Sequence, residues 1–185
     1  MTTASVLDLR RPVAGSLPTR LRLPDLLRIT DEGADDALHG RFDHLLPAGG
    51  LPADERWATR IHADDELDVW LISWVPDKST ELHDHCGSLG ALTVLSGSLR
   101  EYRWDGSKLV RRKLDAGDQA GFPLGWVHDV MRAPDRPAHI STGPTLSVHA
   151  YSPPLTAMSY YEVTRANTLR RSRTILTDEP EGPAA

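Results

Sequence analysis

The sequence predicts an all-β domain that is built as a sandwich or a barrel. Fourteen prolines and fourteen glycines divide the 185 residues into short segments, a pattern that favours many turns. Most of these segments are apolar and rich in residues that favour strands. At this length we expect one domain with a substantial core.

Residues 1–50 are expected to form an N-terminal arm and short helices that pack on the barrel. Residues 1–18 are rich in proline, serine and threonine, which indicates a loose arm. Apolar residues spaced for one helical face indicate a short helix from Pro24 and a second helix within 31–46. Proline is tolerated in a first helical turn, and the proline- and glycine-rich stretch 47–52 ends this region.

Residues 51–177 are expected to form the barrel, because their apolar spacing has the period of strands. We expect strands at 56–62, 67–75, 80–85, 89–96, 99–104, 109–114, 119–122, 126–131, 145–151 and 157–163, with a last one within 165–176. Residues 178–185 are polar and rich in proline, so we expect a disordered tail. No linker divides the chain, and the three regions are expected to form one domain overall.

The composition favours a cytoplasmic protein and argues against two classes of partner. A net charge of −5 argues against nucleic acid and against an anionic membrane. No apolar run approaches the roughly 20 residues of a transmembrane helix. The N-terminus lacks the apolar core of a secretory signal, so we expect none. Cys86 is the only cysteine, which excludes an internal disulfide and fits a reducing compartment.

His83 and His85 are the first candidate metal ligands. Residues two apart on a strand point to the same face. The segment 89–95 that follows is apolar and favours a strand, and Gly97 then allows a turn. The two imidazoles can therefore converge on one metal ion inside a barrel. A His-x-His pair alone is a weak signal, and a third ligand is needed.

The third histidine ends the segment from Gly117 to His128, which has the order G-x5-P-x-G-x2-H. This order resembles the second motif of the cupin superfamily, whose fold is a jelly-roll β-barrel. Gly117 and the pair Pro123 and Gly125 are expected to make the tight turns that bring a strand back to the barrel mouth. His128 would then face the two earlier histidines.

The first cupin motif is present only in part. Its glutamate, which usually follows the second histidine by four or five residues, is replaced by Leu89 and Gly90. We therefore expect three histidines without a carboxylate. Three neutral imidazoles leave the full charge of a divalent metal and open positions on one face, which suits Fe, Zn, Ni or Cu. Zinc with a bound water, in a hydrolytic or hydration site, is the alternative that the ligands allow.

Ser147, His149 and Tyr151 share one face of the strand expected at 145–151. A serine, a histidine and a phenol in a row can form a hydrogen-bonded chain in which each group fixes the orientation of the next. An exposed polar strand face gives the same spacing, so the pattern alone leaves both interpretations open.

The chain is similar to the cysteine dioxygenases, which are thiol-oxidising cupins, and to their bacterial members more than to the animal ones. The similarity extends over about residues 56–161. It is carried by Trp74, Leu82-His-Asp-His85, Gly87-Ser88, Gly97-Ser-Leu-Arg-Glu101, His128 and Ser147-Val-His-Ala-Tyr-Ser-Pro-Pro154.

The resemblance implies an Fe(II) cofactor and a catalytic tyrosine. Tyr151 would place its hydroxyl beside the substrate and dioxygen, and His149 and then Ser147 would orient it. The metal ligands implied are His83, His85 and His128.

The resemblance also implies a substrate-carboxylate arginine on an upstream strand. Arg60 is the best candidate, with Arg56 as the fallback, because a guanidinium binds a carboxylate at two points and keeps its charge. The cysteine that animal members cross-link to the tyrosine is Gly90 here, so we expect no cross-link. Cys86 is expected to point away from the metal. Ala58 replaces a tyrosine of the animal enzymes, so substrate contacts on that side can differ.

The family resemblance implies a thiol dioxygenase that converts L-cysteine and dioxygen to cysteine sulfinic acid. One alternative is a dioxygenase of 3-mercaptopropionate or another small thiol, although relatives with that preference lack the arginine. A second alternative is a metal-binding cupin that senses or scaffolds without turnover. The proline-rich segment 132–144 is expected to form a loop over or beside the barrel mouth.

Overall fold

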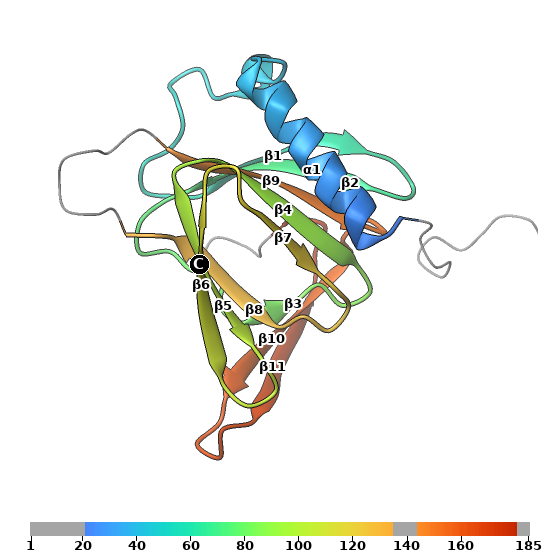
Figure 1. Cartoon of the computed structure of the whole chain (residues 1–185), viewed down its shortest axis with the longest axis vertical. Coiled ribbons are helices and arrows are strands. Elements are labelled where there is room, and N and C mark those ends of the chain that lie inside the picture. Colours follow the sequence, from blue (N-terminus) through green and yellow to red (C-terminus); the bar gives the residue numbers. More distant parts are fainter. Residues whose placement is uncertain (1–20, 135–143, 181–185) are drawn as a thin grey trace, which may run out of the picture.

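The computed structural model describes residues 21–134 and 144–180 (Figure 1). The arm expected at 1–18, most of the loop expected at 132–144 and residues 181–185 of the expected tail lie outside these residues. Asp178 to Pro180, the start of that tail, are described, and Asp178 contacts Arg60.

Eleven strands of the described chain form two antiparallel sheets, which confirms the prediction of an all-β jelly-roll fold. The five-stranded sheet has the order β1 (Trp57–Ala63), β2 (Asp68–Trp74), β9 (Thr145–Ser152), β4 (Leu89–Ser96) and β7 (Gln119–Phe122). The six-stranded sheet has the order β11 (Leu169–Leu176), β10 (Ala157–Val163), β3 (His83–Asp84), β8 (His128–Arg132), β5 (Ser98–Trp104) and β6 (Leu109–Asp115).

Only one α-helix forms where two short helices were expected. The helix α1 runs without a break over Leu23–Leu38. Thr30, at the expected boundary, is fully buried, donates to the carbonyl of Leu27 at 3.0 Å and accepts from Thr93 at 2.9 Å. The helix therefore continues through this point against β4. It ends at Leu38, and Gly40, two residues beyond, has a φ of +77° that suits a helix stop. Only the 3₁₀ turn η1 (Asp43–Leu45) follows.

No helix in the described part of the chain is long and apolar enough to span a membrane. The helix α1 instead lies on the outer face of the five-stranded sheet (Figure 1). Its buried Leu26 and Ala34 pack in one cluster with outward-facing residues of the sheet such as Val69 and Val148.

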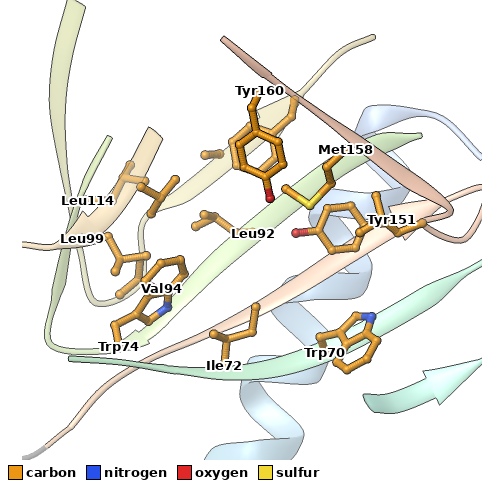
Figure 2. Packing of buried hydrophobic residues seen from close by; sticks show 14 residues of the cluster. Trp70, Ile72, Trp74, Leu92, Val94, Leu99, Leu114, Tyr151, Met158 and Tyr160 are labelled. Carbon is orange, nitrogen blue, oxygen red and sulfur yellow. The ribbon is translucent and has the colours of Figure 1, made fainter. Parts of the chain in front are cut away.

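The second cluster fills the space between the two sheets and positions the site. Side chains of β2 alternate between the clusters, because strand residues point to opposite faces in turn. Val69 and Leu71 face the helix, whereas Trp70, Ile72 and Trp74 face the interior (Figure 2).

Two strands, β3 and β11, are each four residues shorter than expected. β3 covers only two residues of the predicted 80–85, because Glu81 and Cys86 on either side have positive φ values of 60° and 49°. A backbone in this region does not continue a strand. β11 begins at Leu169, because a turn that contains Asn167 at φ 55° occupies the start of the predicted 165–176 segment.

Candidate metal centre

Three buried histidines converge between the sheets. The candidate ligand atoms of His83, His85 and His128 lie within 4.8 Å of one another. His83 pairs directly with His128 across β3 and β8, and His85 follows β3 at once. The turns before His128 contain Gly117 and Gly125 at φ +90° and +74°, as the motif predicts. That these histidines bind a metal remains a prediction.

Hydrogen bonds fix which ring nitrogen of two of the histidines can bind a metal. Nδ1 of His83 is 2.9 Å from the backbone carbonyl of Glu81, and Nδ1 of His128 is 2.9 Å from the carboxylate of Glu101. Both partners accept, so each neutral ring carries its proton on Nδ1 and keeps the lone pair on Nε2. Such outer partners are the usual support of metal-binding histidines.

Glu101 on β5 is a residue to which the sequence analysis gave no role. Its side chain is 1% exposed, and besides His128 it accepts from the indole of Trp126 at 3.1 Å and pairs with Arg112. Burial raises the pKa of Glu101, but the hydrogen bonds and charges of His128 and Arg112 outweigh burial and lower it to about 2. The carboxylate is therefore ionised at neutral pH. Its signal in the sequence is weak: it shares the inward face of β5 with Leu99.

The donor set fits a divalent transition metal. Within residues 21–134 and 144–180, the group at the centre consists of three histidines and contains no carboxylate. Neutral imidazole nitrogen suits iron, zinc, nickel and copper. Glu101 contributes a negative charge one hydrogen bond behind the metal position, which favours a cation there.

A chain of hydrogen bonds leads to the hydroxyl of Tyr151, which favours the first of the two interpretations of this strand. The Trp74 indole donates to Ser147 Oγ at 2.8 Å, Ser147 Oγ is 2.9 Å from His149 Nε2, and His149 Nδ1 is 3.2 Å from the Tyr151 hydroxyl. Ser147, His149 and Tyr151 are all fully buried.

The indole at the start of this chain donates to Ser147 Oγ, because an indole N–H can only donate. The Ser147 hydroxyl keeps a second lone pair as well as its own proton, so the tautomer of His149 sets the direction of the two bonds that follow. In the tautomer with its proton on Nδ1, His149 accepts from Ser147 at Nε2 and donates to the Tyr151 hydroxyl, which leaves the phenol proton available to a group in the site. The Tyr151 ring lies 4.9 Å from that of His85.

A second phenol, which the sequence analysis did not single out, faces the same interior region. Tyr160 on β10 pairs with His83 on β3, and the two rings are 6.1 Å apart. Figure 2 shows the hydroxyl ends of Tyr151 and Tyr160 directed into the space between the sheets. The guanidinium of Arg173 lies 3.9 Å over the Tyr160 ring.

The position of the animal cross-link lies against the tyrosine ring. A Cβ atom at Gly90 would stand 3.3 Å from Cε1 of Tyr151 and 2.9 Å from Cδ2 of Phe122. Cys86 is elsewhere: its Sγ contacts Ser159 Oγ at 3.4 Å. Ser159 alternates with the inward-facing Tyr160, so Cys86 lies on the outer side of β10.

Arg60 lies on the inner face of the five-stranded sheet, near the end of the barrel that holds Tyr151. Register places Arg60 opposite Trp70, which pairs with His149, so these three side chains share one face. The guanidinium lies 4.5 Å over the Trp70 ring. Arg56, the fallback, lies 5.7 Å over Trp74 at the opposite end of the hydrogen-bonded chain.

Comparisons with known proteins place this arrangement in a family context. Residues 53–164 match the family described as cysteine dioxygenase type I. An uncharacterised conserved protein with a double-stranded β-helix domain from Klebsiella pneumoniae is 18% identical, with a TM-score of 0.47 over 71% of this chain and 93% of that chain. A cupin superfamily protein from Desulfitobacterium hafniense is 13% identical, with a TM-score of 0.45 over 59% of this chain and 84% of that chain.

Proposed function

Because the chain belongs to the cysteine dioxygenase type I family, we propose that it is a cytoplasmic thiol dioxygenase with an Fe(II) cofactor and L-cysteine as its substrate. It joins both atoms of dioxygen to the cysteine sulfur and releases cysteine sulfinic acid. The observation that carries the proposal is the buried group of three histidines beside the phenol of Tyr151, whose hydroxyl is hydrogen-bonded to His149.

The first task of the chain is to hold the metal and keep positions beside it open. In this proposal His83, His85 and His128 bind iron through their Nε2 atoms. Iron, when bound, supplies the redox chemistry with dioxygen. Glu101 fixes the ring of His128 and balances part of the positive charge. Burial of all three histidines limits water at the site, which strengthens the remaining electrostatic interactions.

The second task is to place a proton donor beside the reacting sulfur. Tyr151 offers its hydroxyl, and the His149 ring holds that hydroxyl in one orientation, because the other ring nitrogen is fixed by Ser147. A donor that is already oriented needs no reorganisation when charge develops on an oxygen or sulfur atom near it. A protein that only senses or stores a metal has no need of such an oriented phenol.

The third task is recognition of the substrate carboxylate, which we assign to Arg60. Its side chain is 34% exposed and lies on the face that carries His149, and its guanidinium can bind a carboxylate through two nitrogen atoms. Arg56 is the weaker candidate, because it lies over Trp74, at the opposite end of the hydrogen-bonded chain from Tyr151.

Dioxygen uptake by the anaerobically iron-loaded protein tests the proposal. Uptake with L-cysteine that exceeds uptake with 3-mercaptopropionate and cysteamine, with cysteine sulfinic acid as the product, is the expected result. Arg60→Gln should raise KM for L-cysteine at least tenfold and leave iron stoichiometry unchanged, since a charge-assisted pair is lost. Arg56→Gln is the matched control. Preference for 3-mercaptopropionate would make that thiol the substrate in place of L-cysteine. No dioxygen uptake with any of the three thiols, despite bound iron, would overturn the proposed dioxygenase activity.

A further inference from the structure

The guanidinium of Arg60, the proposed carboxylate site, contacts two carboxylates of this chain. Nε lies 3.4 Å from Asp68 Oδ1, an ion pair without hydrogen-bond geometry. Nη2 donates to Asp178 twice, to the side-chain oxygen Oδ2 and to the backbone carbonyl, each at 3.2 Å. Asp178 therefore presents to Arg60 the same chemical group that a substrate carboxylate would present.

The two acidic partners differ in how firmly they are held. The side chain of Asp68 is 4% exposed and accepts from the backbone N–H of Leu155. Asp68 belongs to β2, where it pairs with Tyr151 in register, so it is part of the sheet that carries the site. The side chain of Asp178 is 75% exposed and follows the last strand β11.

Charge balance indicates which of the two carboxylates leaves Arg60 when a substrate carboxylate binds. A third carboxylate beside one guanidinium would add repulsion between like charges at short distance, and such repulsion disfavours binding. Asp68 cannot leave without disrupting β2. Asp178 can leave at the cost of one partly exposed ion pair and two hydrogen bonds, one from Arg60 to the Asp178 carbonyl and one from Thr177 N to Thr156 O.

We propose that Asp178 is an internal competitor for the substrate carboxylate: it pairs with Arg60 in the substrate-free protein and leaves when a carboxylate-bearing thiol binds. This inference rests on the proposed function of Arg60. Asp178 thereby raises the apparent KM for substrates with a carboxylate and leaves thiols without one unaffected. The selectivity for carboxylate thiols is then set by two residues, the cation Arg60 and the displaceable Asp178.

Steady-state kinetics of the iron-loaded Asp178→Asn variant test the proposal. KM for L-cysteine and for 3-mercaptopropionate should fall about two- to fivefold, as expected for the loss of one exposed ion pair, with kcat unchanged. KM for cysteamine, which lacks a carboxylate, should not change. Glu179→Gln is the matched control, because it removes the same charge one residue away and the described contact of Glu179 runs through its backbone.

A chain that ends at Thr177 removes both contacts of Asp178 and should lower KM at least as far as Asp178→Asn. Equal KM values for the Asp178 and Glu179 variants, or an equal change with cysteamine, would overturn the proposal. An unchanged Asp178→Asn variant in an otherwise active dioxygenase refutes the competitor and leaves the proposed function intact.

A second measurement tests whether Asp178 is displaced from Arg60, and it does not require that any thiol be turned over. Amide hydrogen exchange of the C-terminal peptide is followed under anaerobic conditions, with and without 3-mercaptopropionate. Exchange at Thr177 should rise when the thiol is added, since its amide donates to Thr156 in the substrate-free protein. Arg60→Gln should show fast exchange in both states. Slow exchange that 3-mercaptopropionate does not alter would overturn the competitor.

Discussion

Replacement of Glu101 by glutamine should weaken metal binding and destabilise the metal-free protein. The carboxylate is 1% exposed and stands behind a proposed metal ligand, with His128 Nδ1 at 2.9 Å and the Trp126 indole at 3.1 Å. Glutamine keeps the size of the side chain but removes its charge. The guanidinium of Arg112 then loses its carboxylate partner, and a buried charge without compensation is costly.

The magnitude follows from the pKa of Glu101, which falls from 4.5 to about 2 in the folded protein. The difference between these values corresponds to at most about 3 kcal/mol in favour of the ionised folded state, an upper bound because part of the shift comes from the charge of a protonated His128. Arg112 is 38% exposed, so water screens part of its contribution to the lowered pKa of Glu101. We therefore expect Glu101→Gln to lower the free energy of unfolding by about 2 kcal/mol. Because the folded pKa is the lower one, this stabilisation is complete above pH 4.5 and disappears as the pH falls toward 2.

Urea unfolding of the metal-free protein between pH 7 and pH 3 measures the contribution of Glu101 to the free energy of unfolding. Competition with a metal chelator measures the affinity of the protein for the metal. Loss of the partner of a metal-binding histidine should weaken affinity roughly 10- to 100-fold. Glu81→Gln is the control. The backbone carbonyl of Glu81, not its side chain, accepts from His83, and its exposed pair with Arg173 is worth at most about 1 kcal/mol.

Two results would show that Glu101 does not have these roles. One is equal metal affinity in the unsubstituted protein and the Glu101→Gln variant. The other is a stability difference between them that stays the same at pH 3 as at pH 7, because the ionised carboxylate would then not be its cause.

Two further substitutions probe the interior of the site. Tyr151→Phe should keep iron stoichiometry and lower kcat on the order of 100-fold, because one oriented donor is lost; dioxygen uptake checks this, and an unchanged kcat would remove Tyr151 from the mechanism. Gly90→Ala should destabilise the fold by about 1–3 kcal/mol in urea unfolding, because its Cβ would stand 2.9 Å from Phe122. Stability equal to that of the unsubstituted protein would show that Phe122 moves aside freely.

Features that depend on neighbouring residues could be predicted from the sequence. Strand alternation places Ser147, His149 and Tyr151 on one face, and the structure has them there in a hydrogen-bonded row. Gly117 and Gly125 adopt the positive φ that the turns of their motif need. The prediction of an all-β jelly-roll fold is confirmed because it rests on many such local signals together.

Features that depend on contacts between distant segments could not be predicted in this way. Glu101 meets His128 across 27 positions, and Arg60 meets Asp178 across 118 positions. No local pattern marks either pair. The continuity of α1 is a similar case, because Thr30 is kept inside the helix through its contact with Thr93 on another element.

In the proposed function, a three-histidine centre beside Tyr151 adds both atoms of dioxygen to a thiol. The most direct test supplies isotopically labelled dioxygen to the iron-loaded protein with L-cysteine and measures the mass of the product. We expect cysteine sulfinic acid with both labelled oxygen atoms, and no product from a His128→Ala variant. Product that carries one labelled atom, or oxidation of cysteine to the disulfide without labelled oxygen, would contradict it.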